Sequence, residues 1–372
     1  MDSRQNTITK KISSQKKNTS REQGVVVNSN ANSKKIKIVQ YVFTFFLVIF
    51  IIVLFFRFVD LEKFVAILGA GIWYYIVIFF ILQFLYLLIQ PMVFLNLYKI
   101  FSRSGSFWQL FNIFLATNFA NLALPTAGIS GLAIFIGYAE KIGLTRTQAL
   151  IINSIFYIST FFSFIFIILS ILFFPHSWQS INVWEKNVIY VFIFAIIFLT
   201  AVSFAAVMNK KFLVDLIKKL LKFINTIYYF FQKREIVSQS KSNHILDEFF
   251  ILGSALRKNF LMLFKPFVLS FAGHVLHISV LYFIFMAFSS PVSIITAIIG
   301  YIISVVFIFV SVTPSGVGIV EPLMILFFVS EGVTLETATL VTFVFRGVVF
   351  WLPFVFGFFS LRYIHYYEPK NR

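Results

Sequence analysis

The chain of 372 residues is 59% hydrophobic and only 12% charged, with 53 Phe residues and a mean hydropathy of +0.91. This composition excludes a water-soluble globular protein and indicates several apolar spans of about 20 residues each. The net charge of +17 gathers at the N-terminus, in a central segment and in a few loops. In a membrane protein this distribution indicates orientation and attraction to anionic headgroups, so no nucleic-acid partner is expected. Because the chain has no cysteine, thiolate metal sites and thiol nucleophiles are excluded.

The first half of the chain starts with a polar tail and then enters the membrane. Residues 1–37 carry nine basic and two acidic residues, with too few apolar ones to fold, so we expect a disordered basic cytoplasmic tail. The first membrane half, residues 38–208, contains a broken element near 107–143. Its predicted full spans are 38–59, 71–97, 149–174 and 188–208.

The central segment, residues 209–258, is strongly basic. Its Leu and Phe residues alternate with lysines at helical spacing. This pattern predicts an amphipathic helix lying on an anionic cytoplasmic leaflet. The alternative is a soluble helix packed on a partner domain.

The second membrane half, residues 259–365, is followed by a cytoplasmic tail at 366–372. It contains predicted full spans at 260–288 and 338–361, separated by a second broken element near 294–332. Basic residues beside the spans predict that both termini of this multi-pass protein face the cytoplasm. The high content of Ile, Phe, Lys and Asn suggests an AT-rich bacterial source, so we expect a bacterial plasma membrane.

The two broken elements are similar in sequence. The interval from Pro125 to Gly143 is the same as the interval from Pro314 to Gly332, and Thr and Ala then recur two and six positions after each glycine. Gly143 lies beside basic residues and Gly332 between acidic ones, which predicts opposite sides of the membrane and hence an inverted repeat. The alternative is two unrelated Pro/Gly loops.

The predicted fold is therefore an all-α polytopic membrane protein with about six full transmembrane helices and two two-part broken elements. This gives about ten helical segments. Each broken element is either a short crossing pair or a re-entrant hairpin. The residues expected to break the helices and act as hinges are Pro125, Gly128 and Gly131 in the first element, and Pro314, Gly316 and Gly318 in the second.

Two charged residues are expected at membrane depth in the second half. Arg346 lies in the last span, where an arginine costs about 2.5–3.5 kcal/mol on insertion scales. Glu321, which follows Pro314 in the second broken element, is its expected partner. The pair either locks two helices together or lines a polar cavity in which Arg346 receives a lipid phosphate.

Other polar residues near the breaks have two interpretations. Asn118, Asn121, Ser130 and Thr313 either cap broken backbone or bind a headgroup. His274 and His277 share a helical face, and two histidines without a third ligand more commonly pack between helices than bind metal. We expect no metal and no cofactor. The sequence contains no catalytic motif of a metalloprotease, nucleotide hydrolase or serine hydrolase, so we expect no enzyme activity.

These elements resemble the transmembrane region of lysylphosphatidylglycerol synthase, a flippase-like family. The residues that carry the resemblance are Asn121, the stretch 124–128, the stretch 314–321, Gly332, Ala338, Arg346, Trp351 and Pro353. Where many relatives have a Glu and a basic residue after the first glycine, this chain has Ile129, Ser130 and Gly131. The resemblance covers about 38–365 and implies a region that moves phospholipids between leaflets. We expect the chain to lack the synthase domain of two-domain relatives.

The sequence thus predicts a lipid translocase whose polar cavity, between two halves, admits headgroups while the acyl tails stay in the bilayer. Its partners would be membrane phospholipids with anionic headgroups. One alternative is a non-transporting partner or regulator of an envelope-lipid synthase or glycosyltransferase. Another is a membrane-embedded transferase acting on lipid carriers. The lipid, its direction of movement, the energy source and the oligomeric state are left open by the sequence.

Overall fold

The computed structural model describes residues 72–100, 105–123, 129–171, 264–311 and 313–366, together with the single residues 190, 194, 215 and 219. All of them belong to one compact unit, Lys63–Arg372. The predicted tails, the predicted first span and nearly all of residues 172–263, including the basic linker, lie outside the described residues.

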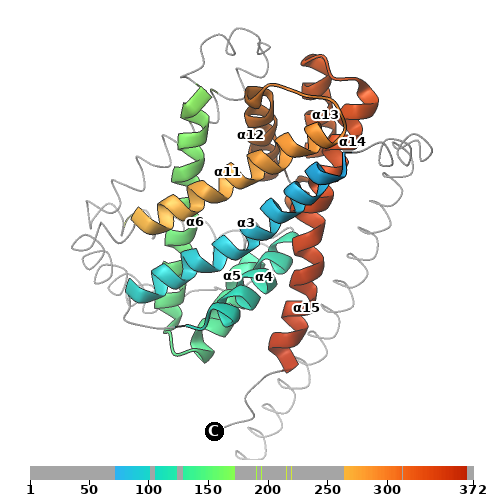
Figure 1. Ribbon diagram of the computed structural model, residues 1–372. Coiled ribbons are helices and arrows are strands. Elements are labelled where there is room, and N and C mark those ends of the chain that lie inside the picture. The colour runs from blue at the N-terminus through green and yellow to red at the C-terminus, as the bar shows by residue number, and fades with distance from the viewer. Residues whose placement is uncertain are drawn as a thin grey trace, which may run out of the picture. The chain divides into compact units, whose positions relative to one another are not determined.

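The described residues form helices and no strands (Figure 1). In chain order the helices are α3 (Trp73–Ile100), α4 (Phe107–Ala123), α5 (Ile129–Lys141), α6 (Arg146–Ser170), α11 (Phe264–Ala287), α12 (Ile294–Val310), η3 (Pro314–Gly316), α13 (Val320–Ser330), α14 (Leu335–Arg346), η4 (Gly347–Trp351) and α15 (Leu352–Tyr366). The η3 segment is a 3-10 turn, and η4 is a π-helical segment that joins α14 to α15. The prediction of an all-α membrane protein is therefore confirmed.

Four helical stretches of the described part are long and apolar enough to cross a membrane. They are Trp73–Lys99, Gln148–Ser170, Phe264–Ala287 and Leu335–Ile364. Each corresponds to a predicted full span, with ends that differ by a few residues. The apolar helices α12 and α13 are shorter, as expected for the two parts of a broken element.

The same turn follows α5 and α13. Gly143 and Gly332 have φ of +85° and +87°, the left-handed conformation that glycine adopts without a Cβ penalty. The next residues, Leu144 and Val333, are buried, and each donates its N–H to a carbonyl five positions back at 3.0 Å. Such a turn ends one helix and orients the next.

Matching threonines begin the helices after these turns. Thr145 and Thr334 have extended backbone, and the hydroxyl of each accepts an N–H from the residue three positions later. Ala149 and Ala338 then donate their N–H groups to the threonine carbonyls and are fully buried. The Thr and Ala shared by the two sequence elements therefore have equal structural roles, which argues against two unrelated loops.

The correspondence extends to whole helices. Both α4 and α12 are apolar helices. They start at Phe107 and Ile294, and we call the difference between these two positions the repeat offset. The order α3–α4–α5–α6 is thus repeated as α11–α12–α13–α14; whether the six-plus-two inverted arrangement is correct stays a prediction.

The equivalent helices α3 and α11 pack against each other and run antiparallel (Figure 1). At one end, Ile72 donates its N–H to the Ala287 carbonyl at 2.9 Å. Further along, the Tyr86 ring lies 3.7 Å from the His277 ring, measured between centroids. As the residue number rises along α3 it falls along α11, so the two helices have opposite directions.

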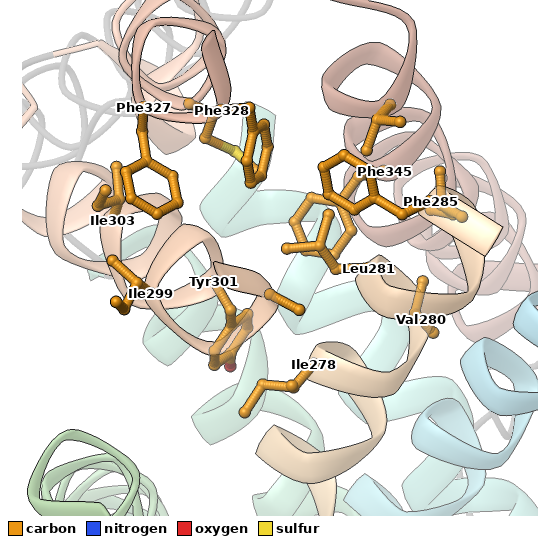
Figure 2. Packing of buried hydrophobic residues seen from close by; sticks show 14 of the residues in the cluster. Ile278, Val280, Leu281, Phe285, Ile299, Tyr301, Ile303, Phe327, Phe328 and Phe345 are labelled. Carbon is orange, nitrogen blue, oxygen red and sulfur yellow. The ribbon is translucent and has the colours of Figure 1, made fainter. Parts of the chain in front are cut away.

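Two buried apolar clusters hold the helices together. One lies mainly among α11, α12, α13 and α14, where the rings of Phe285 and Phe328 meet edge to face with centroids 4.8 Å apart (Figure 2). Gly300 makes this possible, because a Cβ there would lie 2.6 Å from the Phe328 ring. The other cluster lies among α3, α4, α5 and α6.

A close helix contact joins the C-terminal helix to the first half. α15 packs along α4, and a Cβ at Gly357 would overlap the Leu115 carbonyl and lie 2.6 Å from the Phe119 Cβ. Small residues let helix backbones approach in this way inside a membrane. The contact brings α4, the first part of the first broken element, against the chain that follows Arg346.

Candidate functional site

The second broken element has a strained backbone at its centre. α12 ends at Val310 and α13 begins at Val320, so the helix is interrupted between them. Gly316 and Gly318 have φ of +72° and +83°, and the non-glycine Ser315 also has a positive φ of +49°. A non-glycine residue in this region stores strain that surrounding contacts must offset. The contacts of Ser315 must therefore stabilise its left-handed conformation.

Arg346 supplies such a contact. Its Nη2 donates to the Ser315 carbonyl at 2.9 Å, and its Nε donates to Glu321 Oε1 at 2.7 Å. The Phe350 ring lies one turn further along, with its centroid 4.9 Å from the guanidinium carbon. Among the described residues, Nη1 has no hydrogen-bond acceptor. The guanidinium therefore stabilises the break and keeps one donor edge unused.

Glu321 is held from a second side. Its Oε2 accepts the N–H of Gly318 at 2.7 Å, and it lies in the first turn of α13, where the helix dipole favours a negative charge. Arg346 and Glu321 are only 4% and 9% exposed. The carboxylate thus ties the end of the break to α14, and the two charges neutralise each other in a buried setting.

The first broken element is joined by an amide instead of an ion pair. Asn121 of α4 accepts the N–H of Gly131 on Oδ1 at 2.8 Å and donates from Nδ2 to the Tyr157 hydroxyl at 3.1 Å. The Ser130 hydroxyl donates to the Ala120 carbonyl at 2.8 Å. Asn121 therefore connects α4, α5 and α6, which is the capping role considered from sequence.

Some expected hinge residues have other positions. Pro125 and Gly128 lie outside the described residues. Gly131 lies inside α5, beyond the interruption, and a Cβ there would overlap the Asn121 side chain. Gly131 is helical, so it does not act through a special backbone conformation. The absence of a side chain there lets Asn121 approach closely.

Two further expected binding residues make no hydrogen bond to the ion pair. Thr313 is exposed, and its hydroxyl hydrogen-bonds to the Ser311 hydroxyl at 2.7 Å, which shapes the turn after α12. Asn118 is half-buried in α4, and its side chain has no hydrogen-bond partner among the described residues. Asn118, like Arg346, thus keeps hydrogen-bonding capacity that the described residues do not use.

The structure brings the two broken elements together. η3, with Ser315 at its centre, contacts α4, which carries Asn118 and Asn121. η4, directly after Arg346, contacts α3. The end of α4 at Ala123 and the start of η3 at Pro314 lie in different halves of the chain. Segments that are distant in sequence therefore share one region.

The sequence also missed several polar partners. Tyr157 and the Ser315 carbonyl were not predicted, because a tyrosine or a main-chain carbonyl in an apolar span gives no periodic signal. His274 and His277 pack between helices: His274 Nδ1 meets the Tyr301 hydroxyl at 2.6 Å, and its Nε2 meets the Thr160 carbonyl at 3.0 Å. No group of three potential metal ligands occurs in the described part of the chain.

Comparison with known proteins agrees with this architecture. The chain is 25% identical to a UPF0104 membrane protein of Methanocaldococcus jannaschii over 337 residues, which cover 88% of this chain and 96% of that protein. No solved structure is significantly similar to the chain. Residues 38–357 match the family described as the lysylphosphatidylglycerol synthase TM region. The chain is therefore a multi-pass membrane protein that belongs to the lysylphosphatidylglycerol synthase TM region family.

Proposed function

We propose that this protein is a lipid translocase that moves phospholipids, or modified phospholipids, between the leaflets of a plasma membrane. The observation that carries the proposal is the buried Arg346–Glu321 pair at a helix break, with an unused donor edge on the guanidinium. A headgroup phosphate is a good acceptor for that edge, because guanidinium and phosphate oxygens form parallel charge-assisted hydrogen bonds.

The charge balance of the pair suits a headgroup that carries both signs. Without a lipid, the two charges neutralise each other at 2.7 Å. When a lipid enters, Arg346 can turn to its phosphate while Glu321 accepts from a headgroup ammonium or hydroxyl. The exchange keeps the buried region close to neutral, which matters because an uncompensated charge is costly in low dielectric.

The repeated helices suggest how the site would open. The antiparallel packing of α3 and α11 supports an inverted repeat, in which a site near the midplane is exposed alternately to each side. The Pro and Gly residues of the two broken elements would then act as hinges. Asn118, Asn121, Ser130 and Thr313 would contact the headgroup or shape the path from the adjacent break.

The test measures the exchange of fluorescent phospholipids between leaflets of proteoliposomes. We expect the wild type to accelerate exchange and Arg346→Lys to reduce the rate at least tenfold, because lysine keeps the charge and loses the fork of donors. The matched control is Arg146→Gln, which breaks the exposed ion pair with Glu140 and should leave the rate unchanged. Every variant is first checked for an unchanged elution profile.

The second candidate is a non-transporting partner of an envelope-lipid enzyme. It is favoured by the fact that both Glu321 oxygens already have partners within the protein, as a purely structural lock requires. No exchange by the wild type with any headgroup tested would overturn the translocase and support this alternative.

A further inference from the structure

A set of uncharged polar side chains lies along the contact between α3 and α11. Gln83 and Gln90 come from α3, and Ser270, His274 and His277 come from α11; we call these five residues the polar seam. All are buried, with Gln83 only 1% and His277 only 7% exposed. In each helix they recur at intervals of three, four or seven positions, so they share one helical face. Buried amides and imidazoles are costly in a membrane-spanning helix, so several of them on one face indicate a functional role.

The seam is arranged symmetrically in the repeat. The repeat offset that relates α4 to α12 also relates Gln83 to Ser270 and Gln90 to His277. It relates Tyr86 to Gly273, and these two residues lie against each other: a Cβ at Gly273 would be 3.4 Å from the Tyr86 ring. Two equivalent residues can meet only at the midpoint of an antiparallel contact between equivalent helices. The seam, which surrounds Tyr86 and Gly273, therefore crosses the centre of that contact.

Several seam atoms lack a partner. Both amide atoms of Gln83, the Ser270 hydroxyl and His277 Nε2 are buried without a hydrogen bond. The other buried unpaired side-chain atoms of the described part occur singly, on Tyr98, Thr117 and Thr342. Unpaired polar groups away from water are costly and rare in native proteins. Their concentration in one seam indicates a ligand that both donates and accepts.

His274 defines what kind of ligand fits. Its Nε2 meets a carbonyl, which only accepts, so Nε2 carries a proton, and Nδ1 is hydrogen-bonded to the Tyr301 hydroxyl. Apart from the two histidines, neither helix carries an acidic or basic side chain between the ends of the seam. The seam thus offers donors and acceptors without net charge, which fits neither a phosphate nor a cation.

We propose that the polar seam is a second binding site, which takes up hydroxyl groups, either as water or as an alcohol group of a lipid head. The missing side chain of Gly273 faces Gln90, whose Nε2 would lie 3.0 Å from a Cβ there, and the rotatable bonds of a glutamine let it move aside for a small ligand. One hydroxyl oxygen donates once and accepts twice, which matches His277 Nε2 together with either end of the Gln83 amide. The site is separate from the Arg346–Glu321 pair, and its test does not depend on lipid translocation.

The test uses the natural absence of cysteine from the chain. Ser270→Cys introduces one thiol into the seam, and Ser163→Cys is its matched control, because Ser163 is equally buried but its hydroxyl already donates to the Thr160 carbonyl at 2.9 Å. The reaction with neutral methyl methanethiosulfonate requires a hydrated thiol. We expect Ser270→Cys to react at least ten times faster than Ser163→Cys.

Two comparisons separate the sources of the hydroxyl group and guard against a folding defect. If a lipid alcohol binds, phosphatidylglycerol vesicles protect the thiol relative to phosphatidylcholine vesicles, which have no headgroup hydroxyl; if water binds, the two rates are equal. In the wild type, hydroxyl-radical footprinting should label His277 more than His274, whose two nitrogens already have partners. Equal reactivity of the two thiols together with equal labelling of the two histidines would overturn the proposal.

Discussion

The buried ion pair gives the sharpest prediction about stability. In the variant Arg346→Met, methionine occupies a similar volume, but Glu321 is left without its partner in a region where the pair is almost fully buried. Removing one member of a buried pair costs about 3–5 kcal/mol, mainly because the remaining charge is uncompensated. We expect the free energy of unfolding to fall by about that amount.

A second substitution should recover part of this loss. In the double variant Arg346→Met with Glu321→Gln, the remaining charge is removed, and the Gln carbonyl oxygen can still accept the Gly318 N–H. One cost persists, because the Ser315 carbonyl loses its donor, and an unpaired buried carbonyl costs about 1–3 kcal/mol. The double variant should therefore be more stable than Arg346→Met alone by about 2 kcal/mol, the difference between these two costs.

The assay is reversible unfolding of the purified protein in mixed micelles, followed by intrinsic tryptophan fluorescence, for the wild type, both single variants and the double variant. The four values form a double-mutant cycle, which isolates the interaction between the two side chains. If the double variant is no more stable than Arg346→Met, the two charges are not coupled. The reasoning from their burial would then be wrong.

Three further predictions concern the helix contacts and caps, each measured as thermal stability in the same micelles. Gly357→Ala should lower stability by about 1–3 kcal/mol, because the added methyl group overlaps α4. Gly137→Ala is the control: no atom lies within 4 Å of its Cβ, so stability should stay equal or rise by up to about 1 kcal/mol. Equal losses in the two variants would contradict the close α4–α15 contact. Asn121→Ala should cost about 1–2 kcal/mol, since a buried N–H in the first turn of α5 loses its acceptor; an unchanged midpoint would show that this amide does not hold the break. Thr145→Ala and Thr334→Ala should each cost about 1 kcal/mol, because each removes a hydroxyl that accepts the N–H three residues later; no loss in one of the two would argue against the structural repeat.

The sequence was most informative about individual elements. Hydropathy placed the start of the second broken element near residue 294, where α12 starts in the structure, because a Ser cap precedes the apolar run there. It was less accurate for the last span, expected to start at residue 338, since the Thr334 cap starts the helix earlier. The π-helical segment Gly347–Trp351 was not predicted, because a π-helical turn depends on packing around the helix and leaves no periodic signal.

At the site, sequence and structure contributed different parts. The sequence predicts that Glu321 and Arg346 pair, because each lies in an apolar span and an isolated charge at membrane depth is too costly. The third member, the Ser315 carbonyl, and the left-handed conformation that presents it follow only from the folded loop. Asn121 was correctly considered as a cap, but its second bond, to Tyr157, joins residues 36 positions apart.

The sequence by itself determined that this is a helical membrane protein with two similar broken elements, because hydropathy, proline, glycine and capping residues act over a few neighbouring positions. Only the tertiary structure decided which helices meet: that α3 and α11 pack antiparallel, that α15 covers α4, and that a polar seam lies between equivalent helices. Each of these helices is apolar on most of its faces, so its sequence does not indicate which face is buried against protein and which faces lipid. Side-chain packing and the need to pair polar groups across helices make that choice, and both depend on residues far apart in the chain.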